Sequence, residues 1–169
     1  MSSARQNLSS GQMVNVKGID HFHFTIITAE WNKEVTYSLE KACIESLIEA
    51  GIPKNKIQIF KVPGTWELVP AAYQAIHATN TNAVICLGCV IRGETPHFEY
   101  ICQGVTNGLA QLNANQSVPV IFGILTVENH QQAMDRCGGI HGNKGVEAAL
   151  TAIKMIQLNH LIKGLDGNS

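Results

Sequence analysis

Charged side chains are scarce in this sequence. Of its 169 residues, 12 are Lys or Arg and 13 are Asp or Glu, so that 15% are charged, whereas soluble domains carry roughly 25%. The formal net charge is −1 and no run of Lys or Arg occurs, which argues against a nucleic-acid-binding protein, because such proteins need a basic surface. The composition fits either an unusually apolar monomer or an oligomer, in which subunit interfaces would hide part of each surface so that fewer charges need face water.

Several other signals are missing. No apolar run approaches the roughly 20 residues that span a bilayer, and residues 1–17 lack the basic start and apolar middle of a secretory signal. The 5 cysteines are odd in number and scattered, which fits reduced thiols in the cytoplasm better than a disulfide framework. Neither G-x-G-x-x-G nor G-x-x-x-x-G-K-[ST] occurs, and no His/Asp cluster has metal-ligand spacing. We expect a cytoplasmic protein without a metal or a common nucleotide loop.

What the sequence does contain is an alternation of strand and helix patterns. Apolar, strand-like runs cover 22–28, 57–62, 83–90 and 118–126, and helical patterns cover 35–47, 66–78, 101–112, 128–137 and 144–162. This alternation predicts an α/β fold, a three-layer α/β/α sandwich with a four-stranded parallel sheet. We expect a flexible tail at 1–17, in which 13–16 could add an edge strand to a neighbouring sheet, and a single domain at 18–169.

In an open parallel sheet, ligands bind beyond the carboxyl ends of the strands. The groups that follow the predicted strands, or lie along the last one, are Trp31, Thr65, Trp66, Glu67, the segment from Cys89 to His97, Phe122, Thr126 and Arg136. We expect them to gather on one rim. An aromatic plane with backbone amides suits a flat heterocycle, and Arg beside a helix N-terminus suits a phosphate. The pattern therefore suggests two different ligand parts.

Each candidate also has a structural explanation. Trp31 could cover the end of the sheet as a buried anchor, His97 could cap the helix that begins there, and Arg136 is expected near a helix C-terminus from the macrodipole. Cys86 and Cys89 have the C-x-x-C spacing, but they lie inside a predicted buried strand, which argues against a redox or metal pair.

Four segments together resemble the 6,7-dimethyl-8-ribityllumazine synthase family of riboflavin biosynthesis. They are PGTWELVP at 63–70, LGCVIRGETPHFEY at 87–100, VPVIFGILT at 118–126, and GNKG at 142–145 followed by EAA at 147–149. The resemblance runs in order from about 22 to 158 and thus covers most of the chain. It implies a flavodoxin-like fold and a transferase that condenses 5-amino-6-(D-ribitylamino)uracil with 3,4-dihydroxy-2-butanone 4-phosphate, without a cofactor or a metal.

The resemblance also implies roles for individual residues. His97 matches the proton-transfer residue. The residues that match substrate contacts are Trp31, Thr65, Trp66, Glu67, Cys89, Val90, Ile91 and, across a subunit boundary, Phe122. Those that match the phosphate site are Glu94, Thr95, Arg136 and Lys144. Two positions depart from the common pattern of the family. Position 31 is often Phe in the family and is Trp here, and the turn before His97 often carries a second Thr where this sequence has Pro96.

Other interpretations stay open at this point. A riboflavin synthase of the archaeal type would share the fold, a flavodoxin-like module would carry flavin, and a scaffold would have lost its catalytic groups. Family members form pentamers, decamers or icosahedral 60-mer shells with active sites between neighbours, and the short turn at 136–145 resembles that of shell-forming members. Riboflavin synthase is a further candidate partner.

Overall fold

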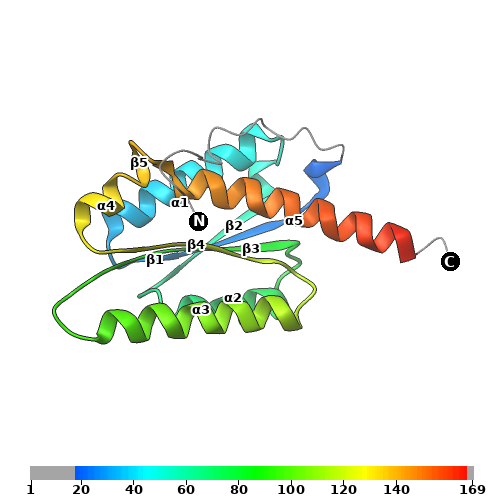
Figure 1. Cartoon of the computed structure of the whole chain (residues 1–169). Coiled ribbons are helices and arrows are strands. Elements are labelled where there is room, and N and C mark those ends of the chain that lie inside the picture. Colours follow the sequence, from blue (N-terminus) through cyan, green and yellow to red (C-terminus); the bar gives the residue numbers. More distant parts are fainter. Residues whose placement is uncertain (1–17, 167–169) are drawn as a thin grey trace.

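A central parallel sheet organises the molecule. The computed structural model describes residues 18–166, the last three by their backbone alone, so the tail predicted at 1–17 lies outside the described residues. The strands are β1 (Phe24–Ala29), β2 (Ile57–Val62), β3 (Ala83–Ile91) and β4 (Val120–Val127), all parallel in the order β2-β1-β3-β4. Figure 1 shows this sheet between two helical layers. The predicted α/β sandwich with four parallel strands is confirmed.

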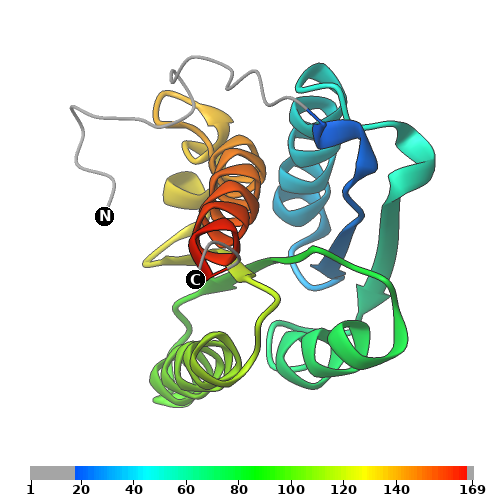
Figure 2. The same cartoon turned by 90° about the vertical axis from the view of Figure 1, so that its right-hand side faces the viewer.

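Helices cover both faces of the sheet. They are α1 (Lys33–Glu49), α2 (Leu68–Ala78), α3 (His97–Asn115), α4 (His130–Met134) and α5 (Lys144–Asp166), with single 3-10 turns η2 (Ile19–His21) and η3 (Lys54–Lys56). In Figure 2, α1 and α5 lie side by side above the sheet, and α2 and α3 lie below it. No helix among the described residues is long and apolar enough to cross a membrane.

The helix predicted at 128–137 is only partly present. It is limited to α4, which the Asn129 side chain caps by accepting a hydrogen bond from the N–H of Gln132 at 3.0 Å. Beyond it lies a small antiparallel hairpin of β5 (Cys137–Gly139) and β6 (Gly142–Asn143). Backbone bonds from Lys144 to Arg136 and from His141 to Asp135 close this hairpin. They draw the chain back, so that no second helical turn forms.

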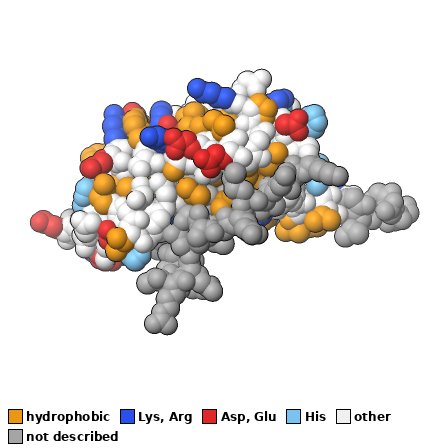
Figure 3. All heavy atoms as spheres, turned by 90° about the horizontal axis from the view of Figure 1, so that it is seen from above, with side chains coloured by type: hydrophobic (Ala, Val, Ile, Leu, Met, Phe, Trp, Pro, Cys, Tyr) orange, Lys and Arg blue, Asp and Glu red, His pale blue; other side chains and the backbone are white. Residues whose placement is uncertain are grey.

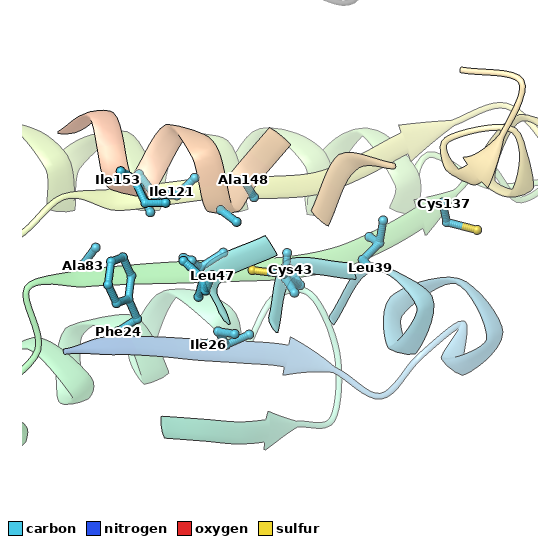
Figure 4. Packing of buried hydrophobic residues seen from close by; sticks show 14 of the residues in the cluster. Phe24, Ile26, Leu39, Cys43, Leu47, Ala83, Ile121, Cys137, Ala148 and Ile153 are labelled. Atoms are coloured by element: carbon cyan, nitrogen blue, oxygen red, sulfur yellow. The ribbon is translucent and has the colours of Figure 1, made fainter. Parts of the chain in front are cut away.

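Two hydrophobic cores lie on opposite faces of the sheet. Because side chains alternate along a strand, Phe24 and Ile26 of β1 face α1 and α5, whereas Ile27 faces α2 and α3. Figure 4 shows the first core, where Leu39 and Leu47 of α1 pack near the sheet. All six residues of β1 are buried, as expected of a strand covered on both faces.

The first turn of α5 is pressed against α1. A Cβ on Gly145 would lie 1.9 Å from the carbonyl oxygen of Leu39, so any side chain there would collide with backbone. The N–H of Gly145 also donates to Oδ1 of Asn143 at 2.8 Å. This contact fixes the start of α5 and the residues that lead into it relative to the sheet.

The outer face of the α1 and α5 layer carries mixed side chains. Figure 3 views the molecule from this side and shows apolar groups between the few charged ones. Along α5, Leu158, Leu161 and Ile162 are exposed. Exposed apolar side chains on a chain with 15% charge are consistent with the oligomer that the composition allows.

Candidate active site

An open pocket lies at the carboxyl ends of β1 and β3. Its volume is about 720 Å³, within the usual range for small-molecule sites. It is lined by Trp31, Asn32, Gly64, Thr65, Trp66, Glu67, Cys89, Val90, Ile91, His97, Tyr100 and Ile101. Eight of the residues singled out from the sequence are thus brought together, from four separate segments of the chain.

Three aromatic side chains in this pocket are unusually exposed. The exposed fraction is 72% for Trp31, 52% for Trp66 and 70% for Tyr100. Large aromatic rings left open to water are favourable contact surfaces for a flat apolar or heterocyclic partner. Trp31 therefore does not serve as a buried aromatic anchor that covers the end of the sheet.

Asn32 joins the first pocket segment to β3. Its side-chain Nδ2 donates to the carbonyl oxygen of Cys89 at 2.9 Å, and its backbone has the left-handed values φ 58 and ψ 48. The preceding N–H of Trp31 donates to the carbonyl of Pro63 at 3.2 Å. These bonds hold the Trp31 segment between the ends of β2 and β3. Sequence reasoning missed Asn32, whose only signal is its place directly after Trp31.

Tyr100 and Ile101 were also missed, although a signal for them existed. They follow His97 at positions i+3 and i+4 of α3, which lie on one helix face. Once His97 is placed at the pocket, this spacing brings the next turn of α3 to the same wall.

The predicted phosphate turn lies between β3 and α3. Glu94 and Thr95 are exposed on this turn, and its flanking residues Ile91 and His97 both line the pocket. The carbonyl of Pro96 accepts bonds from two N–H groups of α3. A helix of 19 residues presents a partial positive charge at its N-terminus, which suits an anion beside this turn.

The side chain of Arg92 braces the same turn. Its Nη1 bonds to Oε1 of Glu99 in α3, its Nε donates to Oε2 of Glu128 at 2.6 Å, and its guanidinium lies 4.2 Å from the ring centre of Phe98. The hydrogen bond from Arg92 holds the pKa of Glu99 below its usual range, and the two carboxylates raise the pKa of Arg92. Arg92 therefore ties the end of β4 to the first turn of α3.

Phe122, Arg136 and Lys144 do not line this pocket. Phe122 lies on β4, Arg136 lies between α4 and β5, and Lys144 begins α5. Phe122 and Lys144 line a hollow of about 320 Å³ beside β4, and Arg136 and Lys144 line another of about 160 Å³. β4 is an edge strand of the sheet. The expectation that Phe122 and Arg136 share one rim with the other groups is thus wrong within one chain, because the hollows beside β4 are separate from the Trp31 pocket.

The charges beside β4 are held by local contacts. Arg136 donates from Nη1 to the carbonyl of Gln132 at 2.9 Å, which caps α4 as expected from the macrodipole. Lys144 bonds through Nζ to Oε2 of Glu147 at 2.8 Å. Glu147 is 7% exposed, so its carboxylate fixes the Lys144 ammonium at the mouth of both hollows.

The thiols offer no reactive pair. Cys86 and Cys89 belong to the two opposite cores, so their side chains point away from each other. Burial raises the pKa of each to about 12, which keeps them protonated and poorly nucleophilic at neutral pH. Within the part of the chain that the structure describes, no three His, Cys, Asp or Glu side chains gather as a metal site.

Comparison with known proteins supplies a family. A family model described as 6,7-dimethyl-8-ribityllumazine synthase matches residues 21–160. A protein of that name from Porphyromonas gingivalis is 47% identical over 161 residues, covering 95% of this chain and 100% of the relative. Another from Cytophaga hutchinsonii is 49% identical over 158 residues, covering 92% and 98%. A third, from Flavobacterium johnsoniae, is 44% identical over 155 residues, covering 92% and 82%.

Proposed function

The chain belongs to the 6,7-dimethyl-8-ribityllumazine synthase family, and we propose that it condenses 5-amino-6-(D-ribitylamino)uracil with 3,4-dihydroxy-2-butanone 4-phosphate to the lumazine, phosphate and water. One observation carries the proposal. The four segments that carry Trp31, Glu67, Cys89 and His97 converge on one open pocket at the carboxyl end of the sheet. This is where a doubly covered parallel sheet binds its ligand.

The apolar part of the pocket suits the uracil substrate. The exposed face of Trp31 can stack on the pyrimidine ring, and the ends of β3 at Cys89, Val90 and Ile91 can border its edge with backbone groups. The loop at 64–67 brings Thr65, Trp66 and Glu67 to the same pocket, where hydroxyl and carboxylate groups can bind the ribityl hydroxyls.

The polar end of the pocket suits proton transfer and phosphate release. Joining an amine to a ketone, expelling phosphate and closing a ring require several proton transfers but no protein nucleophile. His97 lies at the pocket wall in the first turn of α3, and an imidazole can both accept and donate protons near neutral pH. The helix N-terminus, Glu94 and Thr95 form the adjacent turn where the phosphate would bind. Holding both substrates together supplies further acceleration.

The remaining site residues come from a second copy of the chain in this proposal. They are the substrate contact Phe122 and the phosphate ligands Arg136 and Lys144, which lie beside the edge strand β4, apart from the Trp31 pocket. A ring of subunits in which β4 of one copy faces the pocket of the next would complete each site, and the Arg136 guanidinium would stabilise the departing phosphate. We propose a pentamer as the unit, assembled into an icosahedral shell because the turn at 136–145 is short.

The proposal extends to the domain organisation and the location of the protein. We propose that 18–169 form one domain, because both cores share a single sheet. We also propose a cytoplasmic location, since all five cysteines are free thiols and four of them are buried.

The direct test supplies both substrates to the purified protein and follows lumazine absorbance and fluorescence. Product formation is expected, with turnover slowed at least about tenfold by His97→Ala. His77→Ala is the matched control, because His77 is an exposed histidine of α2 outside the pocket. Arg136→Ala should mainly raise KM for the phosphorylated ketone. Riboflavin formed from lumazine alone would instead indicate a riboflavin synthase. A stoichiometric bound flavin without turnover would indicate a flavin-binding module.

A further inference from the structure

A glycine of α3 lies directly beneath the Trp66 side chain. A Cβ on Gly104 would lie 2.3 Å from Cζ3 of Trp66 and 3.0 Å from its Cη2. Both atoms belong to the six-membered ring of the indole. Since non-bonded carbon atoms pack at about 3.5 to 4.0 Å, this ring occupies the space that any other side chain at position 104 would fill.

Gly104 continues the pocket-facing stripe of α3. His97, Tyr100, Ile101 and Gly104 follow one another at i, i+3, i+4 and i+7, which is one helix face. The first three line the pocket, as does Trp66 from the turn before α2. The indole therefore leans on bare helix backbone with one side, and with 52% of its surface exposed it offers the other side to the pocket.

We propose that Gly104 is a positioning residue that sets the width of the pocket for the ribitylaminouracil substrate, by letting Trp66 lie back against α3. A side chain at position 104 pushes the indole off the helix and toward the space between the pocket walls. The effect on substrate binding rests on the proposed function. The packing of Trp66 against Gly104 does not depend on it.

The same helix carries a matched control. A Cβ on Gly108 would lie 2.8 Å from Cγ1 and 2.9 Å from Cγ2 of Val69. Gly108→Ala thus creates a comparable overlap with a residue of α2 and removes a glycine from the same helix. Val69 does not line the pocket. The two substitutions share their effect on helix propensity, and each places a methyl group against a side chain of a neighbouring segment. They differ in whether that side chain belongs to a pocket wall.

The kinetic experiment compares Gly104→Ala, Gly108→Ala and the parent with both substrates. For Gly104→Ala we expect KM for the uracil substrate to rise at least about fivefold, while kcat and KM for the ketone change less than about twofold. For Gly108→Ala, kcat and both KM values should stay within about twofold of those of the parent. Trp66→Phe should suppress the defect, because the phenyl ring lacks the part of the indole that overlaps position 104. The double variant should therefore differ from Trp66→Phe by less than about twofold.

A spectroscopic readout tests the contact without activity. The chain has 2 tryptophans, so Trp31→Phe leaves Trp66 as the sole indole. In that background Gly104→Ala should shift the emission maximum and raise acrylamide quenching, and Gly108→Ala should do neither.

The outcomes separate the two proposals. Failure of the parent to form lumazine overturns the proposed function, and the fluorescence comparison still tests the contact. If the parent is active but Gly104→Ala behaves like Gly108→Ala, or if its defect persists with Phe at position 66, Gly104 does not act through Trp66.

Discussion

Asn32 meets two structural requirements at once. Its left-handed backbone costs most residues other than glycine about 1 kcal/mol or more, and its amide supplies the bond to the carbonyl of Cys89. Asn32→Gly lets residue 32 adopt the left-handed conformation without strain and removes only the hydrogen bond to Cys89. Asn32→Ala removes the bond and adds strain. Comparing the two substitutions separates these contributions.

For Asn32→Gly we expect the free energy of unfolding to fall by about 1 kcal/mol, and for Asn32→Ala by about 1 kcal/mol more. Because Asn32 follows Trp31, both should raise KM for the uracil substrate. Urea unfolding and steady-state kinetics measure the two effects. Equal stability of the variants and the parent would mean that the amide bond contributes nothing.

Arg92 leads to a prediction about protonation. Its hydrogen bond lowers the pKa of Glu99, so Arg92→Ala should let that pKa return toward its usual value of about 4.3. The contact stabilises the fold above the unfolded-state pKa of Glu99 and is lost as the pH falls through the lowered value. A carboxyl NMR titration measures the shift, and KM for the phosphorylated ketone should rise as the turn loosens.

Glu128→Gln is the control for Arg92. It removes the other carboxylate that Arg92 contacts and should leave the pKa of Glu99 low. A low pKa for Glu99 in Arg92→Ala would show that some other group holds it.

At the scale of elements, β3 carries thiols into both cores. Cys86 is buried with its pKa raised to about 12, so the folded state retains a proton that the unfolded chain releases near pH 9. The resulting stability is complete below pH 9 and is lost as the pH rises toward 12, at about 1.4 kcal/mol per pH unit. Between pH 9 and 10.5, the free energy of unfolding of Cys86→Ala should therefore fall by about 1 to 2 kcal/mol less than that of the parent, as measured by urea unfolding.

Val84→Ala controls for the lost packing. Val84 lies two residues earlier on the same face of β3 and is equally buried. Val84→Ala should lower the free energy of unfolding at every pH, and above pH 9 this free energy should fall with pH as steeply as in the parent. If Cys86→Ala keeps that slope too, folding does not raise the pKa of the Cys86 thiol.

The elements were largely predictable because both faces of the sheet are covered. Continuous apolar runs such as that of β3 need no tertiary information, and β2 occupies the residues expected for it. The helix at 128–137 was overestimated because backbone bonds between 135–136 and 141–144 compete with it. Such bonds have no periodic signature.

The pocket was predictable where a residue lies just beyond the carboxyl end of a strand, as Trp31 and Thr65 do. Asn32 and Gly104 could not be found in this way, because each acts through a contact with a distant segment. The separation of Arg136 from the pocket was also hidden, whereas the family resemblance had already placed Phe122 across a subunit boundary. The order of the elements along the chain does not reveal that β4 is an edge strand.

At the scale of the whole molecule, shared sites make a prediction about mixtures. His97→Ala and Arg136→Ala damage different halves of the proposed site. When the two variants are unfolded together and assembled in equal amounts, about one site in four receives both intact groups. Activity at low ketone concentration should then exceed that of either variant alone.

The control is to mix the two variants after separate assembly, which should restore nothing. Native mass measurement on the same samples gives the number of subunits. A monomeric mass, or no recovery after joint assembly, would contradict a site built by two copies.

The position of Arg136 and Lys144 beside the edge strand β4, apart from the Trp31 pocket, has a consequence for timing. If neighbouring copies complete each other's sites, a newly made chain is inactive until it meets a partner, and the rate per chain falls on dilution instead of staying constant. The onset of turnover then follows the law of mass action in the protein itself. Expression level would set not only how much enzyme a cell holds but what fraction of it works.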